Sequence, residues 1–155
     1  MTTRLDELPG RRCSIAGALD VVGDRWALLV VREVSLGAHR FSEILRGTGA
    51  PRERLAARLA ALVDAGVLER REYSRTPPRA DYHLTRSGLD LLPVLQALMQ
   101  WGDRHVADTP PVELHHHGHR ISASWVCDVC GERVGRGTER HVPDGSEPGH
   151  GPLPR

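Results

Sequence analysis

The sequence predicts a mainly α-helical chain with one small β-hairpin, an α+β fold. The stretch Ala50 to Gly66 is rich in alanine, carries apolar residues at helical spacing and ends at a glycine. The stretch Leu68 to Leu84 follows at once as a basic strand, an Arg/Pro loop and a return strand. A helix narrow enough for the DNA major groove, followed by a basic β wing, is typical of a winged helix-turn-helix.

Three helices are expected before this pair. A helical stripe of apolar residues runs from Ile15 to Val22. Asp24 is placed to cap the next helix, Trp26 to about Val34, which is apolar nearly all round and should lie at the centre of the domain. Ser42 is a candidate cap for a brief third helix that ends near Arg46.

The fourth helix should be the recognition helix of the helix-turn-helix, and Pro51 suits its first position. Helical spacing buries one stripe of its side chains, namely Leu55, Leu59, Leu62 and Val63. The opposite face then points outward and holds Glu53, Arg54, Ala57, Ala60 and Ala61. Small alanines on this face would let the helix backbone approach base edges closely. The wing strands are expected at 68–73 and 80–84.

Thr85 should cap a last long helix, from Ser87 to about Val106. Its apolar residues cover more than one face of the helix. A terminal helix of this kind is either an ordinary buried helix or one that packs on its own core and on a second protomer. We favour a homodimer interface, because two protomers also read a longer stretch of DNA.

Positive charge is concentrated on the elements expected to read DNA. The 155-residue chain has a net charge of +1, yet residues 40–86 hold ten Arg against six Asp and Glu. The expected DNA contacts are Arg52, Glu53, Arg54, Ala57 and Arg58 on the recognition helix, Arg40 and Ser42 near the supporting helix, and Arg75 and Arg79 at the wing tip. The alternative is a solvated arginine face, and Arg58, beside the buried stripe, could pair with a carboxylate instead.

Composition also suggests the organisation of the chain. We expect a DNA-binding and dimerisation domain at 1–109, a His/Cys-rich extension at 110–142 and a disordered tail at 143–155. No apolar run approaches the length needed to cross a membrane, and the N-terminus lacks an apolar signal segment. These features predict a cytoplasmic, nucleoid-associated bacterial protein.

Cys13 permits two interpretations. A free cysteine is most often a small buried hydrophobe. Alternatively, Arg11, Arg12 and the start of the first helix would favour its thiolate and make it an oxidant sensor.

The pair Cys127 and Cys130, followed by Gly131, has the spacing of a zinc knuckle. The pair needs two further ligands, and His117 and His119 are the candidates, with His141 downstream. The sequence therefore predicts a small zinc-knuckle-like extension with structural Zn²⁺. The alternatives are a redox-active dithiol or two free cysteines beside a His-rich segment.

Several motifs together resemble those of the HxlR-type transcriptional regulators over Cys13 to about His105. They are Gly23-Asp24-Arg25-Trp26, the run from Arg40 to Leu45, Asp64-Ala65-Gly66-Val67-Leu68, and the run from Pro77 to Thr85. The resemblance implies a homodimer that binds inverted-repeat operators, and in some members one N-terminal cysteine senses oxidants or electrophiles. This chain departs from the family at Ala50-Pro51, where Ile-Ser or Ile-Thr is usual, and at Glu53, where Lys or a polar residue is common.

The first functional hypothesis is therefore a sequence-specific regulator of transcription, a repressor by simple occupancy, controlled by Cys13 or by a small ligand. The second is a metal-binding or protein-interaction module that has lost specific operator binding, motivated by Ala50-Pro51, Glu53 and the His/Cys segment. Enzyme motifs such as a phosphate-binding loop, a nucleophile elbow or a His-Glu-x-x-His helix are missing from the sequence. We expect neither catalysis nor a catalytic cofactor.

Overall fold

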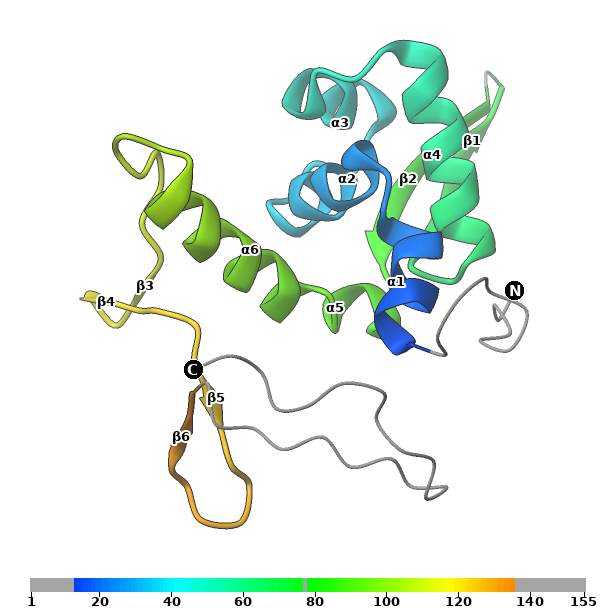
Figure 1. Ribbon diagram of the computed structural model, residues 1–155. Helices are drawn as coiled ribbons and strands as arrows, with labels where there is room; N and C mark the ends of the chain where they lie inside the picture. Colours follow the sequence, from blue (N-terminus) through cyan, green and yellow to red (C-terminus); the bar gives the residue numbers. More distant parts are fainter. Residues whose placement is uncertain (1–12, 77, 136–155) are drawn as a thin grey trace. The chain divides into compact units, whose positions relative to one another are not determined.

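A computed structural model describes residues 13–76 and 78–135 of the chain (Figure 1). The expected tail at 143–155, His141, and the arginines before Cys13 lie outside these residues. The chain forms two compact units that divide between Leu95 and Gln96. Within the described residues, none of the helices is both long and apolar enough to cross a membrane.

The first unit is built around α2, which packs against α1, α3, α4 and β2. The helices are α1 (Ser14–Val22), α2 (Arg25–Ser35), α3 (Phe41–Thr48), α4 (Arg52–Asp64) and α5 (Arg86–Leu89). The buried core consists of Val22, Ala27, Val30, Val31, Val34, Ile44, Ala50, Leu55, Leu59, Leu62, Val67 and Leu68. The prediction of a central, buried second helix is confirmed.

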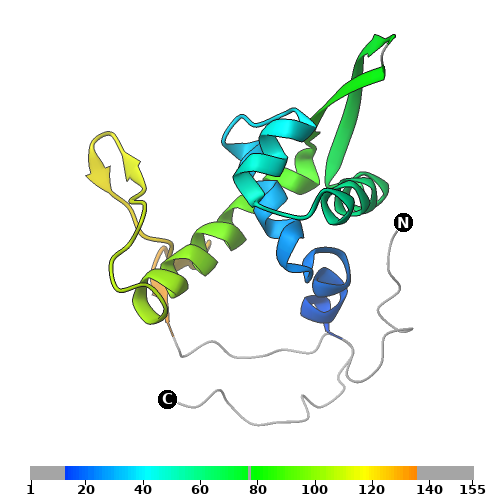
Figure 2. The ribbon, with the colours of Figure 1, turned by 90° about the horizontal axis from the view of Figure 1, so that it is seen from above.

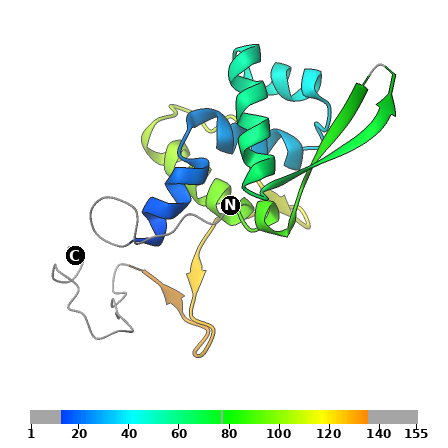
Figure 3. The same cartoon turned by 90° about the vertical axis from the view of Figure 1, so that its right-hand side faces the viewer.

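The wing is an antiparallel hairpin of β1 (Leu68–Arg75) and β2 (Pro78–Leu84). It projects beyond the helices of this unit, as Figures 2 and 3 show. Both strands are longer than the sequence predicts, and a bulge between Glu72 and Ser74 shifts the register near the tip. A bulge leaves one residue without a cross-strand partner and re-aims its side chain, which here is Tyr73.

Helix starts show where local signals compete. The Asp24 cap is confirmed, because its carboxylate accepts a hydrogen bond from the backbone N–H of Trp26 at 2.8 Å. The Ser42 cap is wrong: α3 starts earlier, Arg40 is its N-cap, and Ser42 lies inside the helix. Glu43 decides this start by accepting the backbone N–H of Arg40 at 3.0 Å. Pro51 is likewise the N-cap of α4 rather than its first helical residue.

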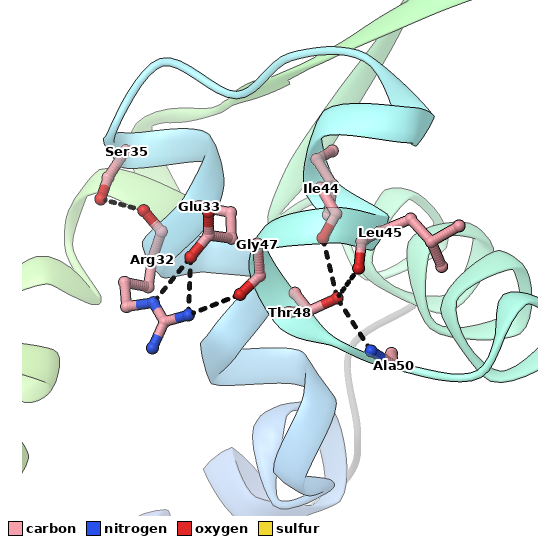
Figure 4. A network of polar contacts seen from close by, with 8 residues as sticks. All are labelled: Arg32, Glu33, Ser35, Ile44, Leu45, Gly47, Thr48 and Ala50. Carbon is pink, nitrogen blue, oxygen red and sulfur yellow. Dashed lines mark hydrogen bonds and ion pairs between the residues drawn. The ribbon is translucent and has the colours of Figure 1, made fainter.

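A buried hydroxyl holds the turn between α3 and α4 (Figure 4). Thr48 donates to the Ile44 carbonyl at 2.8 Å and accepts the N–H of Ala50 at 3.3 Å. Gly49 then turns the chain in the left-handed region, at φ 64°. On the neighbouring side, Arg32 donates to the Gly47 carbonyl at 3.1 Å, which ties α2 to the end of α3. These bonds fix the angle at which α4 leaves the supporting helix.

The predicted single helix from Ser87 to Val106 is wrong, because the chain forms two helices there. The Thr85 cap is correct, since its hydroxyl accepts the Gly88 N–H at 3.2 Å, but the helix it caps is the short α5. The chain resumes as α6 (Leu92–His105). Pro93 explains the break, since it has no N–H to donate to the carbonyl four residues earlier, that of Leu89.

The second unit contains most of α6 and two small hairpins. The hairpins pair β3 (His115–His116) with β4 (His119–Arg120), and β5 (Trp125–Val126) with β6 (Arg133–Val134). The sequence predicts a strand-like run from Ile121 to Val126, but only its last two residues form a strand. Hairpins this short bury few side chains, so they do not form a core of their own.

Candidate nucleic-acid interface

The outward face of α4 is a small-residue surface flanked by charge. Leu55, Leu59 and Leu62 are buried, so their packing fixes the rotation of the helix. The opposite side leaves Arg52, Glu53, Arg54, Ala57, Ala60 and Ala61 exposed. The predicted burial stripe is therefore confirmed, apart from Val63, which is half-buried. A face of short side chains with charges at its N-terminal end can lie close to a DNA groove.

A cationic hollow of about 440 Å³ lies between α3, the start of α4 and the wing. Its lining residues are Arg40, Phe41, Ser42, Arg52, Arg70, Tyr73, Arg79, Ala80 and Tyr82. The structure thus brings together Arg40, Ser42, Arg52 and Arg79, which the sequence predicts separately as DNA contacts. Guanidinium groups present planar sets of N–H donors, which match the oxygens of a phosphate or carboxylate.

Aromatic rings support two of these guanidinium groups. Arg52 lies 5.0 Å above the ring of Phe41, and Arg40 lies 5.8 Å from the ring of Tyr73. Phe41 also packs against the hydrophobic core, so the Arg52 guanidinium rests on an anchored surface. Stacking limits the rotamers of both arginines and orients their N–H groups before any ligand arrives.

Arg70 differs from the other three arginines of the hollow because it has a carboxylate partner. Its guanidinium donates to Glu72 at 2.6 Å, and this bond raises the pKa of Arg70. Within 13–76 and 78–135, no carboxylate pairs with Arg40, Arg52 or Arg79. These three are therefore available to an anion from outside the protein.

Glu43 holds the rim of the hollow in place. Its carboxylate accepts the backbone N–H groups of Arg40 at 3.0 Å and of His39 at 3.1 Å. The bond to Arg40, followed by the bond to His39, lowers the pKa of Glu43. The carboxylate thus acts on the backbone at the helix start and leaves the Arg40 side chain facing the hollow.

Arg58, one of the predicted DNA contacts, has a carboxylate partner within the protein. Its guanidinium forms an ion pair with Asp24 at 3.2 Å, and its Nε atom is buried. The alternative left open by the sequence, pairing with a carboxylate, is the one the structure adopts. Arg58 therefore ties α4 to the N-cap of α2.

Sequence reasoning missed the aromatic and strand components of the hollow, namely Phe41, Arg70, Tyr73 and Tyr82. The orientation of the Tyr73 side chain depends on the bulge in β1, and no sequence pattern reveals that bulge. Arg70 is identifiable from strand alternation, since it lies opposite Tyr82 across the hairpin. Arg75 also belongs to β1, at the tip of the wing.

The predicted metal ligands are not brought together. Within the described part of the chain, no group of three or more His, Cys, Asp or Glu side chains converges on one point. His117 and His119 lie in and after the β3–β4 turn, whereas Cys127 and Cys130 lie in the β5–β6 turn. Hydrogen bonds from the backbone N–H groups of Cys130 and Val129 lower the pKa of Cys127.

Cys13 is the N-cap residue of α1 and is half-buried rather than buried. Its backbone is extended, at φ −151°, and its carbonyl accepts the Gly17 N–H at 3.2 Å. Cys13 thus lies at the N-terminal end of a helix.

Comparison with known proteins identifies the family of this chain. The HxlR-like helix-turn-helix family model matches residues 21–110. The chain belongs to the HxlR-like family. The match spans α2 to α6 and the wing, so it contains the α4 face and the whole cationic hollow.

Relatives of this HxlR-like chain are named as regulators of transcription. The HTH-type transcriptional regulator Rv3095 of Mycobacterium tuberculosis is 41% identical over 142 residues, which cover 89% of this chain and 87% of the relative. That alignment is longer than the helix-turn-helix itself. A shorter relative from Methanothermobacter thermautotrophicus, also named an HTH-type transcriptional regulator, is 37% identical over 58% of this chain and 70% of its own length.

Solved structures agree with this family assignment. PA1607, described as a transcription factor, has a TM-score of 0.76 at 32% identity and covers 85% of this chain and 95% of its own. The reduced form of the transcriptional regulator YodB from B. subtilis has a TM-score of 0.53 at 28% identity, covering 63% and 96%. The redox regulator HypR in its oxidized form has a TM-score of 0.53 at 29% identity, covering 61% and 99%.

Proposed function

We propose that this HxlR-like protein regulates transcription by binding a double-stranded DNA operator as a homodimer. The observation that carries the proposal is the cationic hollow beside α4. Three guanidinium groups that have no carboxylate partner in the described part of the chain, two of them stacked on aromatic rings, are positioned beside a helix face of small residues. Phosphate contacts position a protein on DNA, and base-edge contacts give the sequence preference.

Within this proposal, α4 enters the major groove with its alanine face toward the bases. Arg52 and Arg54, at the N-terminal end of the helix, contact phosphates or base edges, and Glu53 accepts from cytosine N4. Arg40, Ser42 and Arg79 hold the sugar-phosphate backbone across the hollow, and Arg75 and Arg79 reach the neighbouring minor groove or its phosphates. Ala57 provides a methyl contact to thymine.

Exposed apolar stripes on two helices support the homodimer. Val94, Leu98 and Trp101 follow each other at helical spacing on α6, and each is about half exposed. Ile15 and Leu19 form a second exposed stripe on α1. Exposed apolar faces are typical of protein contacts, and a second copy is the partner that paired half-sites require.

Repression is the simpler direction of control, because an occupied operator blocks the polymerase without further machinery. The thiol of Cys13 at the start of α1, or a small ligand near the dimer helices, would modulate this occupancy. Support for the thiol comes from its placement at a helix N-terminus and from the similarity to YodB and to the redox regulator HypR. Oxidation would change α1 next to the proposed dimer contact.

The test compares Arg52→Ala and Arg79→Ala with Arg86→Ala in fluorescence anisotropy on operator DNA. Arg86 is a matched control because it is exposed, lies outside the hollow and pairs with Asp90 at 3.4 Å. Each hollow variant should weaken binding and reduce the log–log salt slope by roughly one unit, whereas the control should change neither. Equal behaviour of all three variants would reject the hollow as the phosphate site. It would leave a metal-binding or protein-interaction module as the function.

A further inference from the structure

Two neighbouring ion pairs on β1 differ in their relation to the cationic hollow. Arg70 donates to Glu72 at 2.6 Å, and Arg71 forms an ion pair with Glu69. Side chains alternate between the two faces of a strand, so each pair lies on a face of its own. Arg70 lines the hollow, whereas Arg71 does not. Of these two pairs, only Arg70–Glu72 therefore adjoins the proposed phosphate site.

The Arg70–Glu72 pair is open to solvent, with side-chain exposures of 41% and 56%. Exposed ion pairs contribute little to stability, because water solvates both charges when they part. A phosphate, by contrast, accepts charge-assisted hydrogen bonds from several guanidinium groups at once. Arg40, Arg52 and Arg79 line the same hollow and add their positive charges. A phosphate that enters the hollow can therefore take the Arg70 guanidinium from the Glu72 carboxylate.

Tyr82 holds Arg70 at the hollow independently of Glu72. It lies opposite Arg70 across the hairpin, and the guanidinium is within hydrogen-bonding reach of its hydroxyl. The Tyr82 side chain packs against the hydrophobic core, and its backbone N–H donates to the His39 carbonyl at 2.8 Å. The Tyr82 carbonyl lies 2.9 Å from Nδ1 of His39. Arg70 thus has an anchored, uncharged partner that does not neutralise its charge.

We propose that Arg70 is a fourth phosphate-binding residue of the hollow and that DNA displaces Glu72 from it. The inference rests on the proposed function, because the incoming anion is a phosphate of the operator backbone. In the free protein, Glu72 occupies the donors of Arg70 and lowers the net charge beside the hollow. On DNA, the guanidinium turns to the phosphate and the carboxylate moves into solvent. Glu72 is a positioning residue that weakens binding to every DNA sequence, since phosphate contacts carry no sequence information.

The experiment compares two double variants of the full chain that keep its net charge. Arg70→Gln/Glu72→Gln removes the pair at the hollow, and Arg71→Gln/Glu69→Gln removes the pair on the other face of β1. Fluorescence anisotropy follows each variant on operator and on unrelated DNA at several salt concentrations. The variant at the hollow should bind both DNAs more weakly than wild type, with the log–log salt slope reduced by roughly one unit. The variant on the other face should match wild type, and urea denaturation checks that both are folded.

The single variant Glu72→Gln isolates the displaced carboxylate. It should tighten binding to both DNAs by up to about fivefold, the range that an exposed ion pair of this kind supports. The ratio between operator and unrelated DNA should stay the same, because the contact is to phosphate. Glu69→Gln changes the net charge equally and should alter binding less.

Three outcomes would overturn the proposal. Wild-type affinity and salt slope in Arg70→Gln/Glu72→Gln would mean that Arg70 does not reach the DNA. Equal tightening by Glu72→Gln and Glu69→Gln would reduce the effect to net charge. A wild-type protein without specific operator binding would overturn the proposed function and this inference together. Arg52→Ala, measured alongside, separates the cases: weakened Arg52→Ala with an unchanged Arg70→Gln/Glu72→Gln would leave the proposed function standing.

Discussion

Some arginines of this chain form ion pairs with its own carboxylates, whereas others leave their charged groups available to a ligand. Arg58 and Arg70 have carboxylate partners at 3.2 Å and 2.6 Å. Arg40 and Arg52 are stacked on aromatic rings and have no carboxylate partner among the described residues. An ion pair neutralises a guanidinium, whereas a stacked guanidinium keeps its charge and its donors for a phosphate.

Arg58→Gln should therefore lower stability without changing the electrostatics of DNA binding. The substitution removes the partly buried ion pair with Asp24, for which about 1 kcal/mol is expected. Urea denaturation measures the loss, and anisotropy at several salt concentrations measures the slope. A shallower salt slope together with unchanged stability would contradict this assignment and return Arg58 to the set of DNA contacts.

Glu43→Gln should make stability less dependent on pH. Hydrogen bonds from the backbone of Arg40 and His39 hold the pKa of Glu43 below its ordinary value of 4.5. A lowered acid pKa means that its contribution is fully present above pH 4.5 and is lost as the pH falls through the lower, folded-state value. The difference in unfolding free energy between wild type and variant should thus be largest at neutral pH and shrink in acid. A difference that grows below pH 4 would contradict the direction of the shift.

The angle between α3 and α4 depends on one buried hydroxyl. Thr48→Val keeps the size of the side chain but leaves the buried N–H of Ala50 without its partner, at a cost of about 1–3 kcal/mol. Thr48→Ser keeps the hydroxyl and is the matched control, with a smaller loss. Thermal and urea denaturation compare the two. A valine variant that is as stable as wild type, or more stable than the serine variant, would contradict the role of the hydroxyl.

Elements with strong local signals are predictable from the sequence. The α4 stripe is set by leucines at helical spacing, and the wing by a basic strand pair, so both appear where expected. The break between α5 and α6 is missed because apolar residues continue across it, although Pro93 removes one helical hydrogen bond. The start of α3 is missed because the sequence suggests Ser42 as the N-cap. In the structure the Glu43 side chain accepts the backbone N–H of Arg40, so Arg40 is the N-cap instead.

The candidate site is predictable only in part, because its charged residues are visible in the sequence whereas their convergence depends on tertiary structure. Charges such as Arg40, Arg52 and Arg79 stand out in the sequence, and the structure places them around one hollow. Their supports, Phe41 and Tyr73, depend on core packing and on a strand bulge, which are tertiary features. The convergence of metal ligands is likewise tertiary, and His117 and His119 do not join the cysteines.

The whole molecule should function as a dimer through α6. Leu98 lies in the middle of the exposed apolar stripe and is half exposed, so Leu98→Glu should not disturb the fold. A buried charge at the contact should instead shift the molar mass in solution from dimer to monomer. Light scattering measures the mass, and circular dichroism checks that helix content is unchanged. Gln96→Glu, which places the same charge on an exposed position outside the stripe, is the control.

A monomeric variant should still bind DNA, but it should bind many sequences weakly instead of binding one operator tightly. One helix-turn-helix reads only a half-site, so a monomer loses the affinity of the second half and most of its specificity. Its remaining binding should depend on salt as electrostatic contacts do. A monomeric Leu98→Glu that binds operator as tightly as wild type would show that α6 has no role in operator binding.

Specific binding to one DNA sequence is tested by competition between two DNAs. Fluorescence anisotropy follows the full-length protein on DNA from upstream of its own gene, with unrelated DNA as competitor at fixed salt. Binding to the operator should be roughly a thousandfold or more tighter than binding to the competitor. Equal, weak and strongly salt-dependent binding to both DNAs would contradict it there, because electrostatics alone would then explain the interaction.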